Sequence, residues 1–215
     1  IDQLDLETYA KDLRGNLYKL WNRLTSGSYF PQPVREVKIP KKSGGYRALG
    51  IRTVDDRIAQ QVVKSYLEPK VDGSFHSDSY GYRQGKNAHQ AIDKAIGRCG
   101  RFAWVLDLDI KGFFDNLDHE LMLKGLHYYI QEKWVSMYVE RWLKTGVVRN
   151  GELVRREKGT PQGGVISPLL ANIYLHITFD KWMERHYPHI MFERYCDDII
   201  VHCRTENEAW FLKRV

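Results

Sequence analysis

Apolar residues recur at helical spacing in some stretches of the chain and form short or alternating runs in others. A repeat of three to four residues predicts an amphipathic helix, and a short run bounded by turn residues predicts a strand. We expect helices at about 6–24, 55–67, 87–96, 120–129, 133–144 and 168–186, with another beginning at Glu206. The first helix is predicted from leucines at helical spacing, namely Leu6, Leu13, Leu17, Leu20 and Leu24.

Strands are expected at 34–40, 48–51, 102–110, 190–195 and 199–203, with a hairpin over 147–154. The hairpin is predicted because Asn150-Gly151 suits a tight primed turn. Helices and strands do not alternate regularly, which favours the α+β class over a doubly wound parallel sheet. With 215 residues the chain has room for one to two domains. Because no linker is visible, two lobes would have to interleave along the chain.

Composition narrows the function classes only moderately. The net charge of +6 is a mild indication of an anionic partner, and 43% hydrophobic with 28% charged residues excludes a disordered tail. The three cysteines, Cys99, Cys196 and Cys203, contain no Cys-x-x-Cys pair, so neither a disulfide framework nor a zinc site is expected, and a reducing, intracellular setting fits best. No signal peptide or membrane-spanning run is visible, and no membrane partner is expected. Because the chain starts at Ile1 and ends within a predicted helix, we expect a fragment of a longer protein.

Carboxylates gather at the predicted strand ends. Asp197-Asp198 occupies a tight connection between two apolar strands, and Asp109 lies near the end of the strand at 102–110. Three carboxylates from two strand ends are what a two-metal phosphoryl-transfer site requires, and their oxygens suit Mg²⁺. Asp107 faces the same way as Asp109, so periodicity leaves open which of the two would be the ligand. An ordinary acidic turn is the alternative.

Basic residues crowd one segment of about 20 residues, where a mobile hairpin could hold a triphosphate or a nucleic-acid backbone. A solvated basic loop is the alternative. These residues are Lys38, Lys41, Lys42, Arg47, Arg52 and Arg57, with the turn glycines Gly44 and Gly45.

A second candidate segment, Gly159–Gly164, precedes the predicted helix at 168–186. Its adjacent glycines would let a base or sugar lie against the backbone, and Gln162 can both donate and accept hydrogen bonds. A simple loop leading into the helix is the alternative. Phe114 could lie under a bound sugar or belong to the core.

Several motifs occur in an order that resembles one enzyme family. Tyr195-Cys196-Asp197-Asp198 resembles the Tyr-x-Asp-Asp box of reverse transcriptases, and residues 109–115 resemble their first palm motif. Residues 159–176 are similar to the corresponding block of group II intron-encoded proteins. Residues 39–51 resemble their fingers block, and residues 79–83 and 88–92 extend the similarity. Cys196 stands where that family usually has alanine.

The resemblance implies a right-hand polymerase fold with fingers and palm subdomains, in which helices pack on one face of an antiparallel palm sheet. It implies fingers at 1–85, palm at 86–119, a helical and hairpin insertion associated with the fingers at 120–158, and palm again at 159–215, ending before a thumb. It assigns Asp109, Asp197, Asp198 and the carbonyl of Ile110 as ligands of two Mg²⁺ ions, for which Mn²⁺ could substitute. Lys41, Arg47 and Gln162 would bind the incoming nucleotide, and Phe114 would exclude a 2′-hydroxyl. We expect RNA contacts at Lys38, Lys42, Arg52, Arg57 and Arg83.

The implied function is RNA-directed DNA synthesis for group II intron retrohoming, with a maturase role in splicing. The implied partners are an RNA template, a DNA or RNA primer, dNTPs and intron RNA in the bacterial cytoplasm, with a homodimer left open. Three alternatives stay open: an RNA-binding maturase with secondary polymerisation, a retron, diversity-generating or CRISPR-associated reverse transcriptase, and a two-metal nuclease. The nuclease has no use for Lys41, Arg47, Phe114 and Gln162 together.

Overall fold

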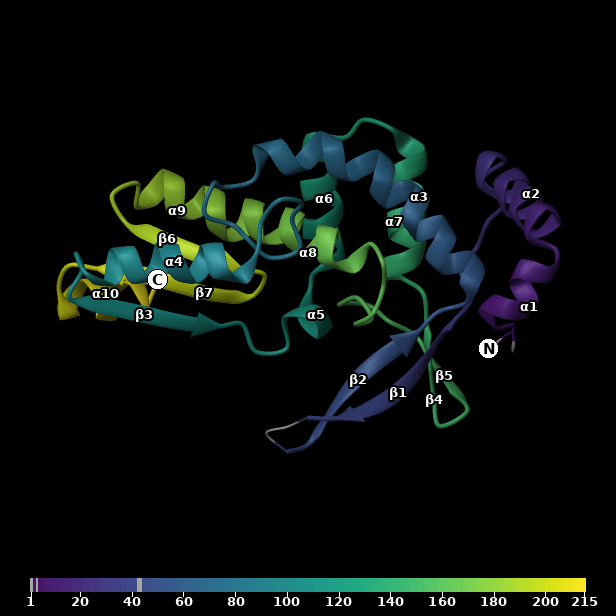
Figure 1. Cartoon of the computed structure of the whole chain (residues 1–215), viewed down its shortest axis with the longest axis horizontal. Helices are drawn as coiled ribbons and strands as arrows, with labels where there is room; N and C mark the ends of the chain where they lie inside the picture. Colours follow the sequence, from purple (N-terminus) through teal and green to yellow (C-terminus); the bar gives the residue numbers. More distant parts are fainter. Residues whose placement is uncertain (1, 3, 42–43) are drawn as a thin grey trace. The chain divides into compact units, whose positions relative to one another are not determined.

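The computed structural model describes residues 2, 4–41 and 44–215, which form two compact units (Figure 1). The first unit contains residues 1–70 and 114–167, and the second contains residues 71–113 and 168–215. Each unit is built from two separated stretches, which explains why the sequence shows no linker. Residues 71–85 group with the second unit and residues 159–167 with the first, so these compact units do not share the limits expected at 85 and 159. No described helix is long and apolar enough to cross a membrane.

The first unit combines a mixed sheet with several helices. In the sheet β1 pairs antiparallel with β2 and parallel with β4, which continues into β5 through a turn at Asn150 (φ 53°) and Gly151 (φ 87°). The tight primed turn is therefore confirmed. The elements are α1 (Leu6–Lys11), α2 (Leu13–Thr25), β1 (Val34–Pro40), β2 (Tyr46–Ile51), α3 (Val54–Val71), α5 (Phe113–Asn116), α6 (His119–Tyr129), α7 (Lys133–Leu143), β4 (Val147–Arg149) and β5 (Glu152–Val154).

The prediction of one helix over residues 6–24 is wrong, because Asp12 divides it. The Asp12 backbone leaves helical geometry (φ −126°, ψ 53°), and its carboxylate accepts a hydrogen bond from the Gly15 amide at the start of α2. This side chain acts as a helix N-cap, which is a common role for aspartate. Of the leucines that suggested the helix, Leu20 is buried whereas Leu6 and Leu13 are exposed.

A buried carboxylate organises the core of the first unit. Asp56 on α3 accepts hydrogen bonds from Tyr29, Trp142 and Gln60 and forms an ion pair of 2.7 Å with Arg52. The carboxylate is therefore satisfied by four donors, as a buried charge must be. These contacts connect α3, α7 and the segment that leads into α3.

The second unit contains an antiparallel sheet in the order β3-β7-β6. Its register pairs Asp109 with Asp198, and Tyr195 with Asp198 across the β6–β7 turn. The elements are α4 (Ala88–Cys99), β3 (Trp104–Asp109), α8 (Ser167–Leu175), a π-helical turn (His176–Asp180), α9 (Lys181–His186), β6 (Met191–Tyr195), β7 (Asp198–Cys203) and α10 (Glu206–Leu212). A short 3₁₀ turn covers Asp72–Ser74.

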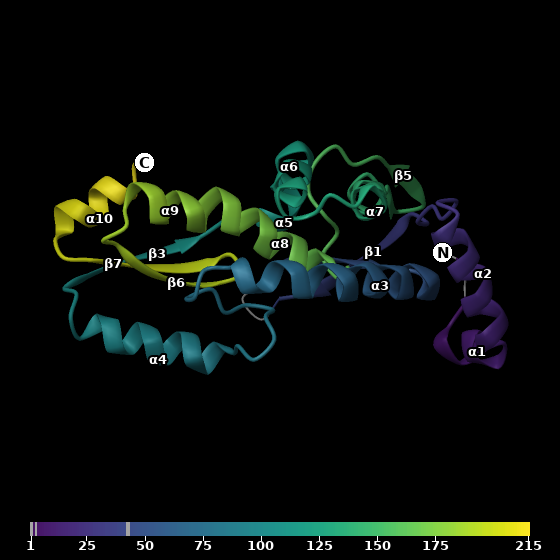
Figure 2. The ribbon, with the colours of Figure 1, turned by 90° about the horizontal axis from the view of Figure 1, so that it is seen from above.

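Helices lie on both faces of this sheet, so the expectation of helices on one face is corrected. One face carries Phe192, Ile199 and Val201, which pack with Met183 on α9 and with residues of α10. Helix α4 lies on the other face, where Arg98 reaches Glu193 of β6 (Figure 2). Asn87 caps α4 through a capping box with Gln90, which confirms the predicted start of this helix.

The long helix predicted over 168–186 is interrupted. Its middle is a π-helical turn over His176–Asp180, between α8 and α9. Such insertions often mark functional positions. Here the turn carries Asp180, which is fully buried and faces Arg194 of β6.

Candidate active site

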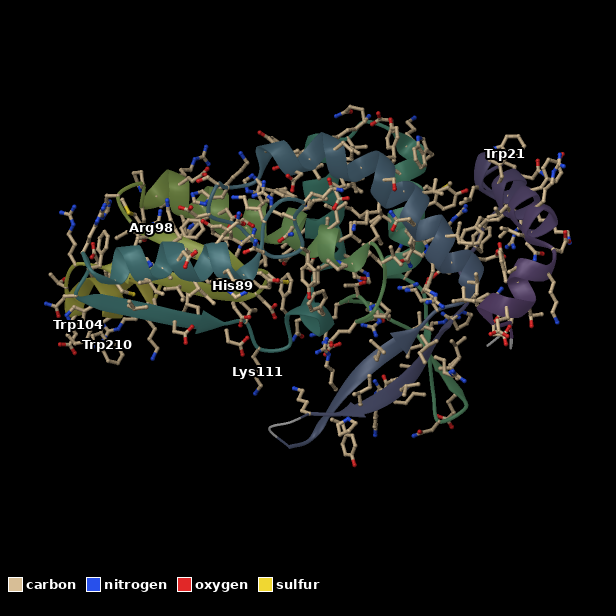
Figure 3. All side chains as sticks on the ribbon, in the orientation of Figure 1. Trp21, His89, Arg98, Trp104, Lys111 and Trp210 are labelled. Atoms are coloured by element: carbon tan, nitrogen blue, oxygen red, sulfur yellow. The ribbon has the colours of Figure 1, made fainter. Side chains whose placement is uncertain are left out.

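The β6–β7 turn and the end of β3 bring three of the predicted carboxylates to one edge of the sheet. Asp198 begins β7 and lies opposite Asp109, the last residue of β3, while Asp197 occupies the turn itself. Asp107 pairs with Ile200, two positions further from the turn. The register therefore favours Asp109 over Asp107, a choice that periodicity left open. Figure 3 labels Lys111, which follows this end of β3.

The carboxylates raise one another's energy when they are ionised. The pKa of Asp198 lies above its ordinary value because of partial burial and the nearby negative charges of Asp197, Asp109 and Asp107. No group of three histidines, cysteines or acids in the described part of the chain surrounds a common point closely enough to hold an ion as it stands. Asp109, Asp197 and Asp198 nonetheless offer only carboxylate oxygens, and none of them forms an ion pair within the described part of the chain. This is the ligand chemistry that suits Mg²⁺.

The Ile110 carbonyl, expected as a further metal ligand, follows Asp109 directly. It accepts a hydrogen bond from the Phe113 amide at 3.1 Å. A carbonyl oxygen has two lone pairs, so it can accept a second interaction. Its role as a ligand stays a prediction.

Cys196 forms the corner of the turn in a left-handed conformation (φ 58°), which is uncommon for a residue with a side chain. Burial and the neighbouring Asp197 carboxylate raise the pKa of the Cys196 thiol to about 12. The thiol is therefore neutral at physiological pH. It is 4% exposed, and it acts as a small packing group under the turn.

Arg194 forms a hydrogen bond with the β6–β7 turn and is itself held by buried partners. Its guanidinium forms two 2.8 Å hydrogen bonds with Asp180 and also donates to the Asn172 side chain and the Cys196 carbonyl. Arg194 and Asp180 are both 0% exposed. Burial acts to raise the pKa of Asp180, but the hydrogen bonds from His176 and Arg194 outweigh it and lower that pKa. Asp180 therefore stays ionised opposite Arg194.

Gly81 packs closely against the backbone of the β6–β7 turn. A Cβ atom at this position would lie 2.5 Å from the Cys196 amide nitrogen, so only glycine fits. Asn172 donates to the Gly81 carbonyl at 2.7 Å, and thus links this segment to Arg194. Sequence reasoning assigned no role to Gly81, Asn172, Asp180 or Arg194. For Asp180 and Arg194, the available signal was their opposite charge within segments predicted to be a helix and a strand.

In the first unit, two predicted nucleotide-binding residues meet although 115 positions separate them. The Arg47 Nε donates to the Gln162 Oε1 at 3.1 Å. The Gln162 carbonyl accepts from the Gly50 amide at 2.8 Å, which fixes the loop to β2. Lys41 is exposed at the hairpin turn, where Gly44 and Gly45 adopt positive φ angles.

The glycines of the 159–164 loop are required by protein packing, whereas the sequence suggested close approach of a ligand. Gly163 has φ 96°, and a Cβ there would lie 2.7 Å from Leu49 of β2. A Cβ at Gly159 would lie 2.6 Å from the Asp115 carbonyl oxygen. The ring of Phe114 is half-buried, and its carbonyl accepts from the Thr160 amide at 2.7 Å. The loop therefore packs against the segment that carries Phe114.

Residues 39–215 match the family described as "Reverse transcriptase (RNA-dependent DNA polymerase)". The chain belongs to the reverse transcriptase family. The resemblance inferred from the Tyr195–Asp198 box is thereby confirmed.

Curated relatives of this reverse transcriptase chain include group II intron-encoded proteins. The protein LtrA of Lactococcus lactis subsp. cremoris is 39% identical over 166 residues, which cover 77% of this chain and 28% of LtrA. The protein YkfC of Escherichia coli is 37% identical over 192 residues, which cover 87% of this chain and 50% of YkfC. The chain thus spans half or less of the length of these relatives.

Solved structures show the same fold. A chain of a partial Cas6-RT-Cas1–Cas2 complex is 25% identical, with a TM-score of 0.58 over 96% of this chain and 34% of that chain. The apo telomerase of Candida tropicalis has a TM-score of 0.65 at 12% identity over 92% of this chain and 46% of that chain. The predicted α+β polymerase fold is confirmed.

Two arginines expected to contact RNA are instead used inside this reverse transcriptase chain. Arg52 is 6% exposed and paired with Asp56, and Arg83 donates to Asp72 and to the carbonyls of His76 and Ser79. The Arg52 guanidinium is buried, and Arg83 donates through all three of its nitrogens, so the structure disfavours contacts of either arginine with a phosphate. Both assignments stay predictions. Lys38 and Arg57 are exposed, and Lys42 lies outside the described residues.

Proposed function

We propose that the chain supplies the fingers and palm of an RNA-directed DNA polymerase encoded by a group II intron. The observation that carries this proposal is the pairing of Asp109 with Asp198 beside Asp197 in the β6–β7 turn. The second unit would correspond to the palm and the first unit to the fingers. The reaction adds a nucleotide to a primer: its 3′-hydroxyl oxygen bonds to the α-phosphorus of a dNTP, the hydroxyl proton is lost, and pyrophosphate leaves.

Asp109, Asp197 and Asp198, with the Ile110 carbonyl, would hold two Mg²⁺ ions, and Mn²⁺ could replace them. When bound, the metals would activate the primer hydroxyl and neutralise charge on the phosphates. The Arg194 and Gly81 contacts fix the turn that carries Asp197. These residues act as positioning residues and would not touch the substrate.

Lys41 and Arg47 would bind the triphosphate of the nucleotide, and Gln162 would lie beside its sugar. Support comes from the hydrogen bond between Arg47 and Gln162, which presets the guanidinium before a nucleotide binds. An arginine so oriented can still donate through its other nitrogens, since guanidinium carries five N–H groups.

Substitution of Phe114 by alanine is expected to raise the use of NTP relative to dNTP by about tenfold or more, because a bulky ring excludes the 2′-hydroxyl by steric clash. The measurement is the ratio of kcat/KM for the two nucleotides on one template-primer. Phe114→Tyr keeps the bulk and is expected to keep the discrimination. An unchanged ratio in Phe114→Ala would show that this ring is not the gate.

A maturase function is the second candidate, and it is favoured by the intron-encoded relatives together with the exposed basic residues Lys38 and Arg57. The protein would then act with its intron RNA in the bacterial cytoplasm, in splicing and retrohoming. Splicing is expected to survive Asp197→Asn and to decline when Lys38 and Arg57 are neutralised. Splicing that fails in Asp197→Asn, or survives neutralisation, would contradict this second role.

The experiment that tests the polymerase proposal is primer extension on four RNA templates that differ only in the first unpaired base. With Mg²⁺, each template should direct incorporation of its complementary dNTP, and EDTA should abolish the reaction. Incorporation that does not depend on the template base, or that persists in EDTA, would contradict the proposal. A DNA template of the same sequence serves as the comparison.

A further inference from the structure

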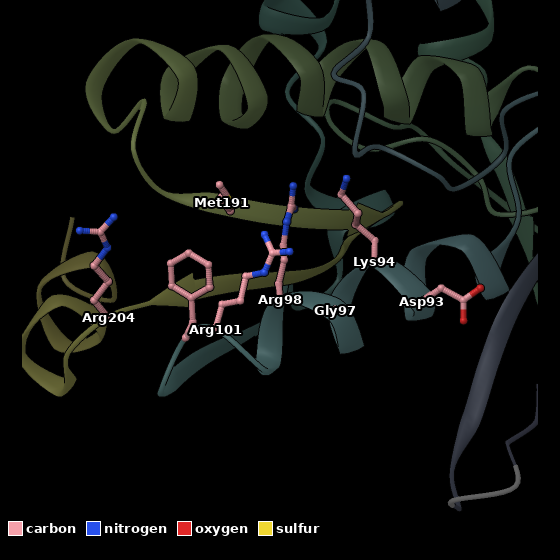
Figure 4. Close-up of a pocket in the computed structure, with 8 residues that line it drawn as sticks. Asp93, Lys94, Gly97, Arg98, Arg101, Met191 and Arg204 are labelled. Carbon is pink, nitrogen blue, oxygen red and sulfur yellow. The ribbon is translucent and has the colours of Figure 1, made fainter.

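A basic pocket lies in the second unit, between α4 and the far ends of β6 and β7. Its volume is about 600 Å³, and it is lined by Asp93, Lys94, Gly97, Arg98, Arg101, Phe102, Met191 and Arg204. Four of these residues are cationic, and Asp93 is the single acid among them. Figure 4 shows the labelled cations Arg204, Arg101, Arg98 and Lys94 following one another along the sheet.

Among the residues that the structure describes, one cation in the pocket is paired with carboxylates, and two others are not. Arg98 is held by ion pairs with Asp78 and Glu193, so its charge is already compensated. Arg101 and Arg204 are exposed, and neither forms an ion pair with the described part of the chain. Two guanidiniums held near one pocket without carboxylate partners provide planar donor groups for phosphate oxygens.

The register places this pocket on the sheet face that also carries the active-site carboxylates. Side chains of paired residues and of alternate residues share a face, so Met191 and His202 lie on the same face as Tyr195 and Asp198. Arg98 of α4 reaches Glu193, which lies between Met191 and Tyr195 on that face. Four residue steps separate Met191 from Tyr195, which is about 13 Å along the strand.

That spacing corresponds to about four base pairs of duplex, because successive pairs rise by about 3.4 Å. We propose that the pocket binds backbone phosphates of the template–primer duplex, through Arg101 and Arg204, about four or more base pairs behind the primer end. This inference rests on the proposed polymerase function and deepens it. It assigns contacts with duplex that has already been copied to Arg101, two residues after α4, and to Arg204, the residue after β7.

The test measures binding of an RNA–DNA duplex to the chain by fluorescence anisotropy between 50 and 400 mM salt. The duplexes have about 3 and about 14 base pairs, and an interstrand cross-link in each keeps the strands paired. Arg101→Ala/Arg204→Ala is expected to bind the long duplex at least about tenfold more weakly and to reduce the slope of log K against log salt by about 2. The short duplex should bind equally to both proteins, since it does not reach the pocket. Inorganic phosphate is also added as a competitor of the long duplex, and it is expected to compete only weakly.

Two further variants keep the test informative about folding and position. Arg185→Ala removes an exposed arginine from α9, on the opposite face of the sheet. This substitution should leave the slope of log K against log salt unchanged within about 0.3. Gly97→Glu adds a negative charge inside the pocket, where a Cβ meets no atom within 4 Å, and should weaken binding of the long duplex. Glutamate also has the higher helix propensity, so a folding defect is not expected.

The outcomes separate this inference from the polymerase proposal. Equal slopes for Arg101→Ala/Arg204→Ala and Arg185→Ala, with normal RNA-templated incorporation, would overturn the proposal that the pocket binds duplex. The polymerase proposal would be unaffected. A pocket-dependent slope without any incorporation would support the pocket and contradict the polymerase. A defect as large on the short duplex as on the long one would also overturn the inference, because it would place the contact near the primer end.

Discussion

Replacement of Asp109 by asparagine is expected to lower RNA-templated incorporation by about 10³-fold, whereas Asp107→Asn should leave the rate within about threefold. Metal ligation is worth several kcal/mol of transition-state stabilisation, and about 1.4 kcal/mol corresponds to a factor of ten. Both aspartates lie on one face of β3, but only Asp109 pairs with Asp198 at the turn. The measurement is single-turnover incorporation with saturating template-primer, dNTP and Mg²⁺.

Asp107→Asn is a matched control because it makes the same chemical change two residues away on the same strand. Thermal unfolding of both variants should resemble that of the unsubstituted chain, since both side chains are exposed. Equal rates in the two variants, or a larger loss in Asp107→Asn, would contradict the assignment of Asp109 as a metal ligand.

Replacement of Arg194 by methionine is expected to lower the free energy of unfolding by about 3–5 kcal/mol. The change leaves the Asp180 carboxylate fully buried without its guanidinium partner, and removes donors to Asn172 and to the Cys196 carbonyl. A surface ion pair would be worth about 1 kcal/mol or less. Urea denaturation measures the difference, provided that unfolding is two-state.

The double variant Arg194→Met/Asp180→Leu provides the control. With both charges removed, part of the lost free energy of unfolding should return, because neither a guanidinium nor a carboxylate is left buried and unpaired, while His176 loses its contact with Asp180. Incorporation should stay slower than in the unsubstituted chain, since the turn still lacks the Arg194 hydrogen bond to Cys196. A loss below about 1 kcal/mol in Arg194→Met would show that the pair contributes little.

Features set by short-range interactions were predictable from the sequence. The Asn87 cap and the Asn150-Gly151 turn depend on neighbouring residues, and both occur as predicted. The π-helical turn and the parallel pairing of β1 with β4 depend on partners far along the chain, and no local pattern marks them. The break at Asp12 is an exception, because a capping aspartate was visible within the leucine repeat.

The candidate site follows the same division. Asp197 and Asp198 at a strand connection suggested a metal site only together with Asp109 on a second strand, and an ordinary acidic turn was the alternative until the family resemblance favoured a metal site. Periodicity could not choose between Asp109 and Asp107; the family resemblance assigned Asp109, and the strand register independently favours it. Arg47 and Arg52 occur in the same basic segment, yet one is exposed beside Gln162 and the other is buried on Asp56. The net charge of a sequence segment does not predict which of its arginines is exposed and which is buried.

The most direct test of the central claim is primer extension by the unsubstituted chain and by Asp197→Asn, on an RNA template with dNTPs and Mg²⁺. We expect incorporation by the unsubstituted chain and none above background by Asp197→Asn, with equal or tighter binding of the template-primer by the variant. Incorporation by Asp197→Asn at nearly the unsubstituted rate would contradict the claim that these carboxylates perform the reaction.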